Sequence, residues 1–135
     1  MNLSGQTIDE LSRALASGAT SSRALVESAL EAIAADGRAF THADFAGARA
    51  AADASDVARA KGHVPSPLAG IPISVKDLFD IAGEATAAGS LILRDAPPAA
   101  RDAPVIARLR TAGAVIVGRT PVSYTHLTLP TILRV

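Results

Sequence analysis

The spacing of apolar residues along the chain predicts helices first and strands later. Apolar positions three or four residues apart predict two leading helices, and an alanine-rich stretch at about 45–60, with charged residues along one side, predicts a third. The first helix carries clear boundary signals, because Thr7 and Glu10 fit a capping box and Gly18 follows the last apolar position. The N-terminal part of the chain is therefore predicted to be largely helical.

The pattern becomes extended in the second half of the chain. The apolar run at 71–75 predicts a strand that starts or lies at a sheet edge, because Pro72 has no backbone N–H to donate. A fourth helix is predicted by DAPVIARLRTAG at 102–113, with Asp102 expected as its N-cap. Residues 114–117, Ala-Val-Ile-Val, then predict a short strand of the fully buried parallel type. Strand, helix and strand together predict a βαβ unit.

These elements predict an open α/β fold with the leading helices packed outside the sheet. The chain has 135 residues, of which 49% are hydrophobic, and this is typical of one folded domain with a core. Two predicted strands are too few for a finished sheet. We therefore expect an incomplete open α/β domain.

Composition and charge narrow the classes of function. The formal net charge is zero, which gives no indication of a nucleic-acid or acidic-membrane partner. The chain has no cysteine, so disulfides and thiolate metal sites are excluded. Its first residues have no export-signal pattern, and its longest uncharged stretch is interrupted by two prolines. We expect a cytoplasmic protein.

The last 15 residues differ from the rest of the chain in composition. Alanine, glycine and acidic residues are frequent earlier, whereas none occurs within residues 121–135. We therefore expect two parts: residues 1–120, which form the α/β portion, and residues 121–135, an unrelated tail that packs poorly against it.

Lys76 is the first candidate for chemistry, because the chain otherwise uses arginine. Of its 13 basic residues only Lys61 and Lys76 are lysine, and Lys76 ends an apolar strand. Binding sites in open α/β sheets gather at the carboxyl ends of strands. Desolvation can lower a lysine's pKa enough to make it a general base, whereas arginine stays protonated. The alternative is a structural lysine that forms an ion pair with Asp77 or Asp80.

The other candidate motifs give weaker indications of function. Residues 113–120, GAVIVGRT, nearly match a phosphate-binding loop, but their apolar middle favours a strand, so nucleotide binding is only an alternative. Ser90 fits either a turn or a position beside a site. The histidines lack the spacing of metal ligands; they are His42, His63 and His126.

Two sequence blocks carry a family resemblance. GIPISVKD at 70–77 and AGAVIVGRT at 112–120 resemble the amidase signature family, and the likeness covers about residues 5–120. The resemblance implies that the chain is the N-terminal portion of a larger open α/β sheet, and that the full-length enzyme hydrolyses an amide through an acyl-serine intermediate, with no metal and no organic cofactor. In that mechanism one serine attacks the carbonyl, a second serine in a cis-peptide linkage relays the proton, and a neutral lysine drives the relay. Lys76 matches this lysine, and Asp77 matches an acidic neighbour with an orienting role.

The resemblance also implies what the chain lacks. The two family serines lie further on, beyond the matching part, and Ser123 falls only near a non-catalytic family serine. We therefore expect this chain to hold the lysine alone and to be inactive by itself. An alternative within the family is the glutamine-hydrolysing amidase subunit of a tRNA-dependent amidotransferase. Alternatives of other classes are a nucleotide-binding α/β protein and a non-catalytic fragment that associates with other proteins. The implied partner is a small amide substrate, and the resemblance allows a homodimer of the full-length enzyme.

Overall fold

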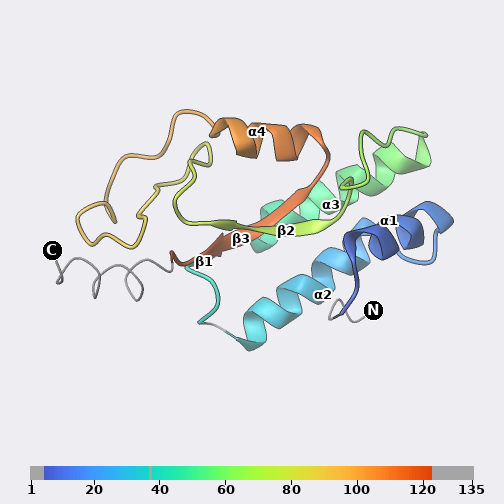
Figure 1. The fold of residues 1–135 in the computed structure, drawn as a ribbon, viewed down its shortest axis with the longest axis horizontal. Helices are drawn as coiled ribbons and strands as arrows, with labels where there is room; N and C mark the ends of the chain where they lie inside the picture. The colour runs from blue at the N-terminus through green and yellow to red at the C-terminus, as the bar shows by residue number, and fades with distance from the viewer. Residues whose placement is uncertain (1–4, 37, 123–135) are drawn as a thin grey trace, which may run out of the picture.

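A mixed sheet lies at the centre of the computed structural model, which describes residues 5–36 and 38–122 (Figure 1). Its strand order is β1-β3-β2, with β3 parallel to β2 and antiparallel to β1. The strands and helices have these bounds in chain order: α1 Ile8–Ser17, α2 Ser22–Ala35, β1 His42–Ala43, α3 Phe45–Ala60, β2 Pro72–Lys76, α4 Pro104–Thr111 and β3 Val115–Thr120.

Helices cover both faces of this sheet. On one face α2 and α3 pack against alternate residues of β3, in a core cluster that includes Val26, Leu30, Val115 and Val117. The other face of β3 carries Ile116, which packs against the cluster that contains Ile106 of α4. In Figure 1, α2 lies below the sheet and α4 above it. The predicted α/β fold with helices outside the sheet is confirmed.

The sequence signals at the start of the chain are confirmed in detail. The Thr7 hydroxyl accepts a hydrogen bond from the Glu10 backbone N–H, and the Glu10 carboxylate accepts one from Thr7 N–H at 2.7 Å. Gly18 then ends α1 in the left-handed conformation that favours glycine (φ 73°). Ser21 caps α2 by accepting a hydrogen bond from Ala24 N–H.

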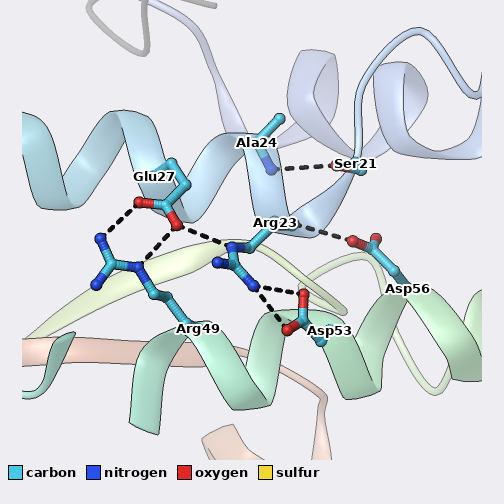
Figure 2. A network of polar contacts seen from close by, with 7 residues as sticks. All are labelled: Ser21, Arg23, Ala24, Glu27, Arg49, Asp53 and Asp56. Carbon is cyan, nitrogen blue, oxygen red and sulfur yellow. Dashed lines mark hydrogen bonds and ion pairs between the residues drawn. The ribbon is translucent and has the colours of Figure 1, made fainter. Parts of the chain in front are cut away.

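Helices α2 and α3 are joined by ion pairs as well as by apolar packing (Figure 2). Glu27 of α2 accepts hydrogen bonds from Arg49 of α3 at 2.8 and 2.9 Å and from Arg23 at 2.8 Å. Hydrogen bonds from these two guanidinium groups hold the pKa of Glu27 down at about 2. Arg23 also pairs with Asp53, while Asp56 accepts hydrogen bonds from two backbone N–H groups at the start of α2. These contacts link α2 and α3 along their partly exposed side.

Glycine is required where the chain enters β2. Gly70 has a φ of +82°, and a Cβ placed there would lie 3.0 Å from Ser22 Cβ and 2.9 Å from Ser55 Oγ. The buried Ser22 hydroxyl donates a hydrogen bond to the Gly70 carbonyl at 2.8 Å. The first residue of the GIPISVKD block therefore lets β2 begin directly against α2.

The βαβ unit is confirmed, with shifts at its element ends. Strand β2 runs from Pro72 to Lys76, so Lys76 is its last residue. Strand β3 extends three residues past Val117, the end predicted for it. Pro72 begins an edge strand, as expected. The expected cap of α4 is wrong: Ala103 is the N-cap and makes no side-chain cap, while Asp102 accepts hydrogen bonds from Ala82 N–H and Arg110 Nε. Within the described residues, no helix has the length and apolarity needed to cross a bilayer.

Candidate active site

Lys76 occupies the carboxyl end of β2, where it pairs in register with Thr120 of β3. Its side chain is exposed, whereas those of its neighbours Val75 and Asp77 are buried, as expected for alternation along an extended chain. The Lys76 carbonyl accepts hydrogen bonds from Leu78 N–H at 2.7 Å and from Phe79 N–H at 3.3 Å. The strand therefore ends in a tight turn directly after the candidate lysine.

Asp77 is part of a buried ion pair with Arg119. The Asp77 carboxylate lies 2.7 Å from Arg119 Nη1, and the side chains are 7% and 3% exposed. The Asp77 backbone N–H also donates to the Thr120 carbonyl at 2.8 Å, which continues the β2–β3 pairing by one residue. Both the backbone and the side chain of Asp77 are thus fixed to β3.

Arg119 holds several acceptors of the segment that follows β2. Its Nε lies 2.7 Å from Glu84 Oε2, and its Nη2 donates to the Phe79 carbonyl at 3.1 Å and to Thr86 Oγ1 at 3.5 Å. Together with Asp77, these groups form what we call the Arg119 clamp. A buried charge is costly unless it is paired and hydrogen-bonded, and this guanidinium meets both conditions.

The GRT sequence at 118–120 is part of a strand and does not form a phosphate-binding loop. A Cβ on Gly118 would lie 2.5 Å from the His42 carbonyl oxygen, so glycine allows β1 to approach β3. The Arg119 carbonyl accepts a hydrogen bond from Thr41 N–H at 2.9 Å. The segment pairs with strands on both sides. The nucleotide-binding alternative therefore loses its motif, as the apolar middle of the segment predicted.

A hollow of about 430 Å³ lies beside the clamp; the residues that line it include Thr41, His42, Asp77, Gly83, Glu84 and Arg119. Its charged groups are the ones that already pair with each other in the clamp. Across residues 5–36 and 38–122, no group of three or more His, Cys, Asp or Glu side chains could hold a metal ion. The charged groups that line the hollow are therefore already engaged in ion pairs within the chain.

The remaining candidate residues lie on elements other than β2. Ser90 lies in a turn closed by its own N–H, which donates to the Ala87 carbonyl at 2.8 Å. His42 lies in β1, and His63 follows the end of α3. Ser123, His126 and nearly all of the predicted tail lie outside the described residues. Of that tail the structure describes Pro121 and the buried Val122.

Sequence reasoning missed the role of Arg119. The GAVIVGRT segment nearly matches a phosphate-binding loop and also belongs to the AGAVIVGRT block of the family resemblance, and neither match gives Arg119 a buried partner. The available signal was different: an arginine lies inside a segment that is otherwise predicted as a buried strand. Such a charge needs a buried partner, and the nearest strand end carries the acidic Asp77.

The comparisons with known proteins agree on one family. The Amidase family model matches residues 24–131. The chain is 53% identical over 112 residues to AtzE, the 1-carboxybiuret hydrolase subunit of Pseudomonas sp. (strain ADP), a match covering 81% of this chain and 24% of that protein. It is 40% identical over 122 residues to a subunit of the glutamyl-tRNA(Gln) amidotransferase of Salinispora arenicola (strain CNS-205), covering 88% and 25% of the two chains.

A solved structure shows the same fold. The native peptide amidase from Stenotrophomonas maltophilia superposes with a TM-score of 0.80 at 34% sequence identity, over 87% of this chain and 25% of that one. The chain therefore spans about a quarter of the length of the relatives that it matches.

Proposed function

Because this chain belongs to the Amidase family, we propose that it forms the N-terminal part of an enzyme that hydrolyses a carboxylic amide to an acid and ammonia or an amine. One observation carries the proposal at the level of residues. The family-matched Lys76 is the last residue of an edge strand, and the segment after it is held by a buried ion-pair cluster. A base that must act at a defined point needs such a fixed backbone.

The proposed reaction uses Lys76 as the base. A serine Oγ attacks the amide carbonyl carbon, and its proton passes through a second serine, in a cis-peptide linkage, to the Lys76 amine. That proton then moves to the leaving nitrogen as the C–N bond breaks, and water hydrolyses the acyl-serine that remains. The catalytic serines are proposed to lie in polypeptide that this chain does not include, so the chain by itself is proposed to be inactive.

The role of Lys76 requires that it be covered. A lysine accepts a proton near neutral pH only when burial lowers its pKa. In the described part of the chain the Lys76 side chain is exposed. We propose that the polypeptide supplying the serines also covers Lys76, which couples assembly of the site to activation of the base.

The test uses a hybrid enzyme in which the 112 aligned residues of the Pseudomonas relative are replaced by those of this chain. The hybrid is assembled as that relative is and assayed for ammonia release from 1-carboxybiuret, simple amides and glutamine. Replacing Lys76 with Arg keeps the charge but removes the base, and we expect kcat to fall by at least about 100-fold, the lower end of general-base contributions. Lys76→Ala should be equally inactive.

Lys61→Arg is the matched control, because it makes the same replacement at the only other lysine and should leave the rate unchanged. Circular dichroism and thermal unfolding establish that each variant is folded. A folded hybrid that hydrolyses none of the amides, or a Lys76→Arg variant that keeps most of its rate, would contradict the proposal.

A second candidate function is glutamine hydrolysis as the amidase subunit of a tRNA-dependent amidotransferase. It is favoured by the likeness to the glutamyl-tRNA(Gln) amidotransferase subunit of Salinispora arenicola, at 40% identity. Saturable ammonia release from glutamine, exceeding that from the other amides, would support it. The cytoplasmic location expected from the sequence and a homodimer of the full-length enzyme stay predictions, to be tested by fractionation and by light scattering.

A further inference from the structure

The structure connects the candidate base to a residue across the sheet. Lys76 is followed by a turn whose two closing hydrogen bonds both end on the Lys76 carbonyl, from Leu78 N–H and Phe79 N–H. Arg119 of β3 binds this turn at two points, the Asp77 carboxylate at 2.7 Å and the Phe79 carbonyl at 3.1 Å. The guanidinium therefore grips the turn on both sides of Leu78.

Backbone hydrogen bonds on both sides of β3 hold Arg119 in place. The Arg119 carbonyl accepts a hydrogen bond from Thr41 N–H of the segment that enters β1, and the next carbonyl, that of Thr120, accepts one from Asp77 N–H. On its outer side the guanidinium reaches Glu84 and Thr86, so the loop after the turn is tied to the same group. Strand β3 thus acts as the fixed frame against which the end of β2 is placed.

Only a planar fork can make these contacts together. Nε, Nη1 and Nη2 of Arg119 each bind a different acceptor, and those acceptors lie on different parts of the 77–86 segment. A lysine ammonium is a single point of charge on a flexible stem and cannot reproduce this geometry. Position 119 therefore requires the planar shape of arginine. The Arg119 side chain is only 3% exposed, so water does not compete for its hydrogen bonds.

We propose that Arg119 is a positioning residue that sets the location of the Lys76 amine through the turn at 76–79. Its part in catalysis rests on the function proposed above, whereas its effect on Lys76 is a property of this chain. If the clamp only stabilised the fold, its geometry could change without any change at Lys76. If it positions the base, a change in the clamp that leaves the fold intact must be detectable at Lys76.

The chain offers a direct probe, because Lys61 and Lys76 are its only lysines. The full 135-residue chain is labelled with carbon-13 at lysine Cε and gives two NMR signals, which Lys61→Arg and Lys76→Arg assign. Arg119→Lys keeps the charge and removes the fork; its added lysine gives a third signal, which Lys61→Arg and Lys76→Arg made in the same background distinguish from the other two. We expect it to shift the Lys76 signal and to increase the mobility of the 76–79 backbone amides, while the Lys61 signal stays in place.

Arg49→Lys is the matched control, since Arg49 also makes a two-nitrogen contact with a carboxylate, Glu27, but on the α2–α3 surface (Figure 2). It also adds a third lysine signal, and it should change neither the Lys61 nor the Lys76 signal. Asp77→Asn is a second variant that keeps the volume and weakens the grip on the turn, and it should shift Lys76 in the same way. A folded Arg119→Lys chain with an unchanged Lys76 signal overturns the proposal. So does unfolding of both clamp variants under conditions where Arg49→Lys stays folded.

Activity in the hybrid enzyme separates this proposal from the proposed function. Arg119→Lys should lower kcat at least about tenfold with little change in KM, because a displaced base slows proton transfer and leaves substrate contacts in place. A comparable rise in KM, with kcat retained, would contradict positioning. If the hybrid has no activity at all while the NMR signals respond as expected, the amidase proposal fails and the structural link between Arg119 and Lys76 stands.

Discussion

Removing Arg119 alone should damage the fold more than removing both members of its buried ion pair. In Arg119→Met the Asp77 carboxylate loses its charged partner, although it remains at a site where it is 7% exposed. Breaking a buried pair by deleting one partner costs about 3–5 kcal/mol of the free energy of unfolding, because a charge is left without compensation. Methionine keeps most of the side-chain length, so lost packing adds little.

The double variant Asp77→Asn/Arg119→Met removes that uncompensated charge. What remains is a buried amide with incomplete hydrogen bonding, which costs about 1–3 kcal/mol. The double variant should therefore be more stable than the single Arg119→Met variant by about 2 kcal/mol, although it carries more changes. The second acidic partner of Arg119, Glu84, should matter less than Asp77. Its side chain is 29% exposed and can rehydrate, so Glu84→Gln should lower the free energy of unfolding by less than about 1 kcal/mol.

Urea unfolding of the 135-residue chain, followed by circular dichroism, measures these differences. With a slope of about 1–3 kcal/mol/M, Arg119→Met should lower the unfolding midpoint by at least about 1 M, and the double variant should recover a clear part of that shift. If the single and double variants unfold at the same midpoint, Asp77 is not left as a buried charge. The clamp would then owe its effect to packing alone, and the electrostatic reasoning would be refuted.

Three further predictions concern other features of the chain. Gly118→Ala would place a Cβ 2.5 Å from the His42 carbonyl oxygen, so β1 must move away from β3, and thermal unfolding should show a loss of about 1–3 kcal/mol. Glu27 has its pKa lowered from 4.5 to about 2, so its ion pairs stabilise the fold above pH 4.5 and lose this effect as the pH falls towards 2; the difference in unfolding midpoint between the natural chain and Glu27→Gln should shrink over that window. The 135-residue chain by itself should release no ammonia above background from simple amides or glutamine, and saturable release abolished by Lys76→Ala would show that it contains a nucleophile.

Local signals in the sequence predicted the helices and the βαβ unit well. The Thr7–Glu10 capping box and Gly18 act within one helical turn, so their residue types alone specify where α1 begins and ends. Asp102 shows the limit of such reasoning. Its type and position fit an N-cap, but Arg110 and the Ala82 N–H compete for the same carboxylate, and Ala103 takes the cap position. Tertiary partners decided between two local possibilities.

The candidate site was predictable only at one of its two strands. Lys76 stands out because it is one of two lysines and because strand ends in open sheets gather function. Arg119 lies far along the chain from Lys76, and its link to Asp77 depends on the register that pairs Val75 with Arg119 and Lys76 with Thr120. That register includes an irregularity between Ile73 and Ser74, which the alternation of apolar residues does not predict.

Arg119 and Lys76, at the paired ends of β3 and β2, show why a chain that otherwise favours arginine has a lysine at position 76. At Arg119 the side chain is buried against two carboxylates, where a permanent charge and a planar fork are both needed, and arginine supplies them. At Lys76 the proposed task is to give up and regain a proton, which an arginine cannot do. Each residue would fail in the other's place, for opposite reasons. Exchanging them, as Lys76→Arg and Arg119→Lys, should therefore lose the base in one case and its fixed location in the other, with the loss in kcat arising from two separable causes.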